Sequence, residues 1–90
     1  MGQMRLSQAS HFKKDVKKMQ KRGKDLAKLK VVVELLLAEK SLPPRNKDHQ
    51  LGGNWCGHRD CHIEPDWILI YKMFDDELRL ERTGTHSDLF

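Results

Sequence analysis

The chain has 90 residues, a mass of 10.6 kDa and a formal net charge of +4, which together fit one small domain. This length excludes a dinucleotide-binding sheet, and no apolar run reaches the roughly 18 residues of a membrane span. The lysine-rich N-terminus also lacks the apolar core of a secretory signal, and two cysteines are too few for a disulfide scaffold. We therefore expect a single domain over residues 1–90, located in the cytoplasm and without membrane contact.

The positive charge is concentrated in the N-terminal half of the chain. Residues 1–40 contain eleven Lys and Arg against four Asp and Glu, a net of +7. Residues 41–90 contain six against nine, a net of −3. Such a basic run favours a polyanionic partner, because the phosphates it neutralises release counterions. A solvated helix face explains the run equally well, so charge alone leaves both interpretations open.

Hydrophobic periodicity predicts two helices in the basic half. Apolar residues recur every three or four positions over residues 8–22 and again, more densely, over residues 24–40. Gly23 separates the two segments, and Pro43 and Pro44 end the second. The connection is short, so we expect a helical hairpin.

The second half of the chain has strand character. Residues 67–73 are aromatic and β-branched, residues 78–82 alternate between apolar and charged, and Asp75-Asp76 between them predicts a hairpin turn. Residues 56–64 also read as a strand, and a weaker signal covers Met4–Leu6. Helices followed by strands predict an α+β fold with two N-terminal helices packed on a small antiparallel β-sheet.

One of these strands has a conflict of parity. Strict alternation places Leu78, Leu80 and Arg82 on the same face, yet two of them are apolar and the third is charged. We expect either a β-bulge before Arg82 or a position for Arg82 beyond the edge of the core.

Residues suited to proton transfer gather in the second half. Four of the five histidines lie in the last 42 residues, and they are His49, His58, His62 and His86. Imidazole both gives and takes protons near neutrality, and an arginine matches the shape of a phosphate. On a small basic chain, histidines with a carboxylate and an arginine are typical of metal-free RNA cleavage, in which the ribose 2′-hydroxyl attacks the phosphorus. Lone histidines are more often structural, so a non-catalytic interpretation stays open.

Two other interpretations concern the same region. A zinc site could be formed by Cys56, His58, Cys61 and His62, but neighbouring residues of a strand point to opposite faces, and the spacing is poor for zinc. Trp55 and Trp67 could stack on a base, although tryptophans are more often part of a core.

Three motifs give the chain a family resemblance. They are Lys47-Asp48-His49, then Arg59-x-x-His62-x-x-Pro65-Asp66-Trp67, then Arg82-x-Gly84-x-His86-x-x-Leu89-Phe90. In this order, and over nearly the whole chain, they resemble the YafQ branch of the RelE/ParE toxin superfamily. The resemblance implies a RelE-like microbial RNase fold. It also implies the toxin of a type II toxin–antitoxin module, a cofactor-free endoribonuclease that cleaves mRNA in the ribosomal A site and inhibits translation.

The resemblance also implies roles for individual residues. The expected catalytic residues are His49, His62, Asp66, Arg82 and His86. Asp66 would be the general base, His86 the general acid and Arg82 the cation on the phosphate, with His49 and His62 orienting or assisting. Trp67 and Phe90 would contact the mRNA. The expected contacts to 16S rRNA are Lys13, Lys14, Lys17, Lys18, Lys21 and Arg22.

The expected partners follow from the same resemblance. They are a cognate DinJ-like antitoxin, in a toxin–antitoxin heterotetramer, and the 70S ribosome with its mRNA. Cys56 and His58 depart from the family, whose members more often have a basic and an aromatic residue there, and this departure would weaken an RNA contact. The alternatives are a catalytically decayed relative that acts as a binding or corepressor partner of its antitoxin, and a ParE-like toxin directed at gyrase.

Overall fold

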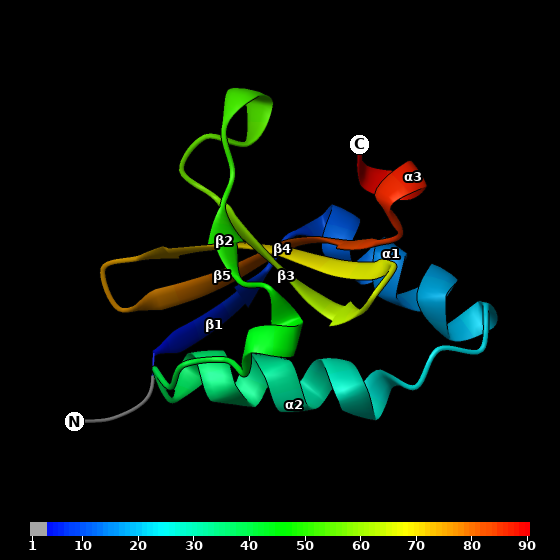
Figure 1. The fold of residues 1–90 in the computed structure, drawn as a ribbon, viewed down its shortest axis with the longest axis horizontal. Coiled ribbons are helices and arrows are strands. Elements are labelled where there is room, and N and C mark those ends of the chain that lie inside the picture. The colour runs from blue at the N-terminus through cyan, green and yellow to red at the C-terminus, as the bar shows by residue number, and fades with distance from the viewer. Residues whose placement is uncertain (1–3) are drawn as a thin grey trace.

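The computed structural model describes residues 4–90, and its centre is one five-stranded mixed sheet in the order β1-β5-β4-β3-β2 (Figure 1). The strands are β1 Arg5–Gln8, β2 His49–Gln50, β3 Arg59–Glu64, β4 Trp67–Phe74 and β5 Glu77–Gly84. Strands β5, β4, β3 and β2 pair antiparallel, as predicted, but β1 pairs parallel with β5. The prediction of a wholly antiparallel sheet is therefore wrong at this edge. Parallel pairing needs a long crossover, which the helices and the intervening strands supply.

Two helices cover one face of this sheet. Helix α1 spans Ser10–Lys21 and helix α2 spans Leu26–Leu37, close to the predicted ranges. Gly23, with a φ of 85°, makes the left-handed turn between them, and Asp25 caps α2 by accepting a hydrogen bond from the backbone N–H of Ala27 at 3.0 Å. Their apolar faces form the main core with the sheet, and its fully buried members include Met19, Cys61, Trp67, Leu69 and Leu78.

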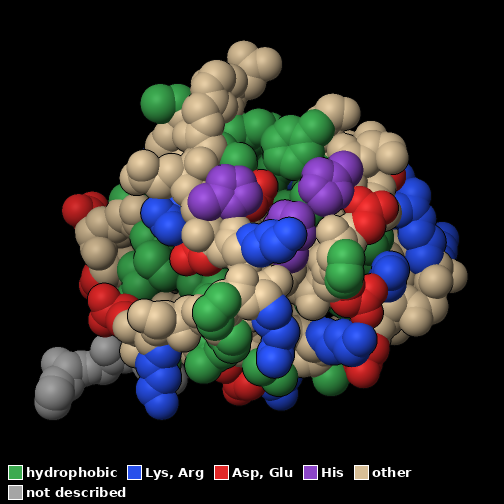
Figure 2. Space-filling view, viewed as in Figure 1, with side chains coloured by type: hydrophobic (Ala, Val, Ile, Leu, Met, Phe, Trp, Pro, Cys, Tyr) green, Lys and Arg blue, Asp and Glu red, His purple; other side chains and the backbone are tan. Residues whose placement is uncertain are grey.

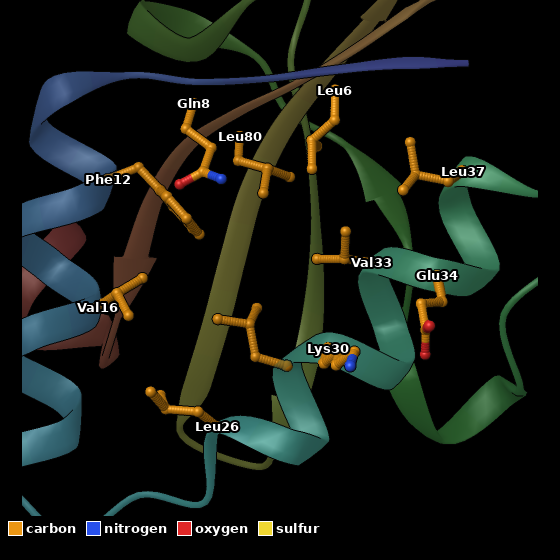
Figure 3. A pocket seen from close by; sticks show the side chains of 11 residues that line it. Leu6, Gln8, Phe12, Val16, Leu26, Lys30, Val33, Glu34, Leu37 and Leu80 are labelled. Atoms are coloured by element: carbon orange, nitrogen blue, oxygen red, sulfur yellow. The ribbon is translucent and has the colours of Figure 1, made fainter. Parts of the chain in front are cut away.

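The two helices do not pack against each other along their whole length. Their apolar side chains point toward an open groove of about 350 Å³ (Figure 3). Leu6 of β1 and Leu80 of β5 form the bottom of this groove. The predicted hairpin is therefore splayed, and its two helices contact the sheet at separate places.

The opposite face of the sheet is covered by loops and one short helix. Ile68 and Ile70 of β4 pack there against Leu89, with Leu51 and Trp55 alongside. Leu89 belongs to helix α3, His86–Leu89, and Trp55 ends the 3-10 turn η2, Gly53–Trp55. A second 3-10 turn, η1, spans Pro44–Asn46. Within residues 4–90, no helix has the length and apolar character needed to cross a lipid bilayer.

The parity conflict in β5 is resolved by a bulge. Tyr71 pairs with Leu80 and Ile70 with Arg82, so Glu81 has no partner across the ladder. The extra residue moves Arg82 into register with Ile70, whose side chain belongs to the loop-covered face, while Leu80 remains in the helix-covered core. The prediction of a bulge is confirmed.

Candidate active site

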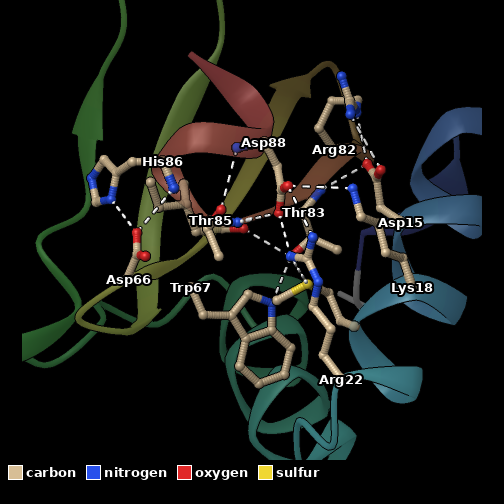
Figure 4. A network of polar contacts seen from close by, with 12 residues as sticks. Asp15, Lys18, Arg22, Asp66, Trp67, Arg82, Thr83, Thr85, His86 and Asp88 are labelled. Carbon is tan, nitrogen blue, oxygen red and sulfur yellow. Dashed lines mark hydrogen bonds and ion pairs between the residues drawn. The ribbon is translucent and has the colours of Figure 1, made fainter.

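His86 and Asp66 form the closest pair of ionisable groups on the loop-covered face. Nδ1 of His86 lies 2.6 Å from Oδ1 of Asp66, and the same oxygen accepts the backbone N–H of His86 at 3.0 Å (Figure 4). These hydrogen bonds, first the backbone bond and then that of the ring, lower the pKa of Asp66. An ionised carboxylate only accepts hydrogen bonds, so Nδ1 of His86 carries a proton.

Two further rings border this pair. His62, on β3, meets His86 edge-on with 5.4 Å between ring centroids. Phe90 lies on the other side of His86 at 6.4 Å, and 61% of its surface is exposed. The expected RNA contact of Phe90 thus has an open aromatic surface beside a histidine.

His49 reaches the same area from β2 through its pairing with β3. It stands opposite Asp60 in the ladder, and its Nδ1 lies 3.1 Å from Oδ1 of Asp60. That nitrogen forms its hydrogen bond with the backbone oxygen of Lys47, at 2.7 Å. Both neighbours are acceptors, so Nδ1 again carries the proton and Nε2 is left to accept one.

Asp60 is a site residue that the sequence reasoning missed. Only 3% of it is exposed, and burial raises its pKa, while the nearby charges of His49, His62 and His86 oppose the shift. One buried carboxyl group therefore lies within electrostatic reach of all three histidines. A signal for it existed, because Asp60 and His62 are two residues apart on one strand and share a face. Figure 2 shows histidine side chains gathered on this side of the molecule, with Lys and Arg side chains between and beside them.

The helix that carries His86 is fixed by its first residues. The side chain of Thr85 caps α3 by accepting the backbone N–H of Asp88. The carboxylate of Asp88 in turn accepts the backbone N–H of Thr85 at 2.9 Å. Asp88 also pairs with Arg22 at 2.7 Å and Lys18 at 3.3 Å (Figure 4), and the bond from Arg22, followed by that from Thr85, holds the pKa of Asp88 well below its usual range. A Cβ at Gly84 would stand 2.9 Å from Oδ2 of Asp88, so the glycine of the third motif makes room for this cap.

The guanidinium of Arg82 forms its ion pair with helix α1. Its Nε donates to Oδ2 of Asp15 in α1 at 2.7 Å and its Nη2 donates to Oδ1 at 3.2 Å (Figure 4). Only 20% of its side chain is exposed. The fork of the guanidinium thus ties β5 to α1, and its expected role as the catalytic cation stays a prediction.

Trp67 requires a correction. It is fully buried in the helix-covered core, and its Nε1 donates to Oγ1 of Thr83 at 2.9 Å. A base has no access to a ring in that position, so the prediction that Trp67 contacts mRNA is wrong. The tryptophan on the loop-covered face is Trp55, which is half-buried and meets His58 edge-on at 5.3 Å.

Comparisons with known proteins place this geometry in a family. Residues 4–90 match the family of bacterial toxins of type II toxin–antitoxin systems described as YafQ. The chain belongs to the YafQ family. It is 53% identical to the mRNA interferase toxin YafQ of Escherichia coli K12, over 100% of this chain and 99% of that protein. It is 34% identical to a YafQ relative from Haemophilus influenzae, over 93% of this chain and 89% of that protein.

Solved structures of YafQ proteins have the same fold. The crystal structure of YafQ from E. coli BL21(DE3) superposes with a TM-score of 0.93 at 52% identity, covering 98% of this chain and 99% of that one. The YafQ chain of the E. coli DinJ–YafQ toxin–antitoxin complex superposes with a TM-score of 0.91 at 53% identity, covering 98% of each chain. The α+β architecture with two N-terminal helices is therefore the YafQ architecture.

The basic residues of α1 in this YafQ-family chain are all on the surface. Lys13, Lys14, Lys17 and Lys21 are exposed, and so are Lys18 and Arg22, which pair with Asp88. Their expected contact with 16S rRNA stays a prediction, but the last turn of α1 is joined by ion pairs to the helix that carries His86.

The zinc interpretation fails on the placement of its ligands. Cys61 is fully buried in the helix-covered core, and burial raises the pKa of its thiol, whereas His62 lies on the other face. His58 bonds to Glu81 at 3.2 Å. Cys56 is exposed.

Proposed function

We propose that this chain is an mRNA interferase: an endoribonuclease toxin that cleaves mRNA in the ribosomal A site and thereby stops translation. The observation that carries the proposal is the convergence of three histidines and two carboxylates on one face, in a chain that is 53% identical to an mRNA interferase over its whole length. Imidazoles beside an open surface suit an acid–base reaction on RNA, which brings its own nucleophile in the 2′-hydroxyl.

His86 is the proposed general acid. In the proposed reaction His86 acts as the doubly protonated imidazolium: Asp66 accepts the hydrogen bond of Nδ1–H, and Nε2–H gives its proton to the departing 5′-oxygen. From the sequence we expected Asp66 itself to be the general base. Its lowered pKa makes it a weak base, and its two bonds to His86 support a role in orienting that ring.

His49 is the proposed general base. Its Nδ1 is bound to the carbonyl of Lys47 and lies beside the Asp60 carboxyl, so Nε2 is free to take the proton of the 2′-hydroxyl. The bond from O2′ to phosphorus forms while the bond from phosphorus to O5′ breaks. The products are a 2′,3′-cyclic phosphate and a 5′-hydroxyl end. His62, edge-on to His86, lies where the phosphate charge develops and stabilises it.

The proposed partners match the charge distribution. The DinJ–YafQ complexes of E. coli support a cognate DinJ-like antitoxin for this chain. The exposed lysines of α1 support binding to rRNA phosphates. A 90-residue chain has little surface with which to orient an mRNA, and a ribosome would supply that orientation.

Mapping of mRNA 5′-ends after a brief induction tests the proposal. We expect new 5′-hydroxyl ends inside translated codons with the natural chain, and none with His86→Gln. Purified protein should cleave mRNA in programmed ribosomes and leave the same free mRNA intact. Growth arrest with intact messages would refute the proposal, and accompanying DNA damage signalling would favour the gyrase-directed alternative.

A further inference from the structure

A cleft between η1 and the β3–β4 turn adjoins His62. It has a volume of about 270 Å³, and its lining includes Arg45, Lys47 and His62. Arg45 and Lys47 are exposed, and no carboxylate of residues 4–90 lies within ion-pair distance of either. Two cations without a protein counter-ion therefore stand beside a histidine of the active site.

The one acidic residue of the cleft is already neutralised. Glu64 accepts hydrogen bonds from Lys24 and from Lys28, each at 2.8 Å, and these bonds lower its pKa. The cleft therefore keeps a net positive charge, which suits an anion.

The segment that carries the two cations is anchored on both sides of Lys47. Before it, the buried side chain of Asn46 donates a hydrogen bond to the backbone oxygen of His62 at 2.6 Å. After it, Asp48 accepts hydrogen bonds from the hydroxyl of Tyr71 and, at 3.2 Å, from Nε of Arg59. Lys47 itself has a φ of 47°, a left-handed conformation that these anchors maintain. The backbone beneath the cations is thus fixed to β3 and β4 before any ligand binds.

We propose that this cleft binds a backbone phosphate of the RNA substrate next to the scissile bond, through Arg45 and Lys47. The inference rests on the proposed function, and the two cations are open to a ligand, whereas the guanidinium of Arg82 is already paired with Asp15. Arg45 offers a planar fork to two phosphate oxygens and Lys47 offers a point charge. A phosphate held there places the neighbouring phosphodiester against His62 and His86.

The test is binding of a 2′-O-methyl RNA trinucleotide, which carries backbone phosphates but lacks the nucleophile. The ring signals of His62 report occupancy by NMR in the natural chain, Arg45→Ala, Lys47→Ala and the double variant. The control is Lys30→Ala, which removes one exposed positive charge from α2 at the groove between the helices. Both positions in the cleft are exposed, so these variants keep the fold.

We expect each cleft variant to bind the trinucleotide about tenfold more weakly, since a hydrogen bond to a charged group is lost. The slope of log Kd against log salt should fall by about 0.7 for each cation removed, and Lys30→Ala should bind like the natural chain. Equal losses in Lys30→Ala and in the cleft variants would show diffuse attraction and overturn the proposal, as would natural affinity in the double variant. Trinucleotide binding without any mRNA cleavage by the natural chain would instead refute the proposed function and leave the cleft standing.

Discussion

The roles of Asp66 and His86 can be separated by a double-mutant cycle. If Asp66 acts only by orienting His86, its removal matters only while His86 is present. Replacement of His86 by Gln removes a proton carrier, which costs about 10²- to 10⁴-fold in cleavage rate. Replacement of Asp66 by Asn removes the negative charge that orients the ring and leaves one neutral amide oxygen as acceptor, and loss of such an orienting carboxylate costs about 10- to 100-fold.

The structure places Asp66→Asn at the low end of that range. The side chain of Asp66 is 64% exposed and that of His86 is 54% exposed, so water replaces part of the lost interaction. The amide oxygen of Asn can still accept the backbone N–H of His86, and the Thr85–Asp88 cap still holds the start of α3. We therefore expect about a tenfold loss for Asp66→Asn and about a thousandfold loss for His86→Gln.

The decisive quantity is the rate of the double variant. Orientation predicts that Asp66→Asn with His86→Gln is no slower than His86→Gln alone, because both changes affect one function. The measurement is single-turnover cleavage of mRNA in programmed ribosomes. The control is Asp76→Asn, because Asp76 in the β4–β5 turn forms a similarly exposed ion pair, with Arg5 of β1 at 2.9 Å. If the two losses multiply to about 10⁴-fold, Asp66 acts independently of His86 and our reassignment is wrong.

Other changes test the remaining assignments. Trp67→Phe should lower the free energy of unfolding by about 2 kcal/mol, because it opens a gap in the core and removes the bond to Thr83. The cleavage rate of the folded protein should stay unchanged. A lower rate without a loss of stability would support the prediction that Trp67 contacts RNA. Asp88→Asn should cost about 1 kcal/mol at pH 7. Because the folded pKa of Asp88 is lowered, its contribution is present above the ordinary carboxyl pKa and is lost as pH falls below it, so the melting temperatures of the two proteins should converge in acid; a constant gap would contradict this. Replacing Lys13 and Lys17 by Ala should flatten the salt dependence of ribosome binding, with a slope change of about 0.7 to 0.9 for each contact, and an unchanged slope would rule α1 out.

The helices, the main hairpin and the bulge were all accessible from local sequence signals. Alternation exposed the conflict between Leu80 and Arg82 and offered a bulge as one of two solutions, and the structure has the bulge. The parallel pairing of β1 was not accessible, because its partner β5 lies more than 60 residues away and nothing local sets the direction of a short edge strand. The ion pair of Arg82 with Asp15 spans 67 residues and was hidden for the same reason.

The error at Trp67 has a more specific cause. Trp67, Leu69 and Tyr71 face the helices, but Ile68 and Ile70 between them are also fully buried, under the loops and α3. A strand buried on both faces has no polar alternation to show which side a residue occupies. The resemblance implied an RNA contact for Trp67, but Trp67 begins β4 and points into the core, whereas Asp66 before it lies exposed in the turn.

The uneven charge along the chain becomes a specific pattern in space. The acidic half supplies carboxylates to the basic half, Glu64 to α2 and the residues before it and Asp88 to the last turn of α1, and within itself it pairs Asp66 with His86. These pairs neutralise positive charge where the elements meet at the surface. Among residues 4–90, the cations without an ion pair include Lys13, Lys14, Lys17 and Lys21 on α1, and Arg45 and Lys47 around Asn46 beside His62. Folding therefore turns a sequence of net charge +4 into a site bordered by free cations, which is the electrostatic arrangement that a strand of RNA requires.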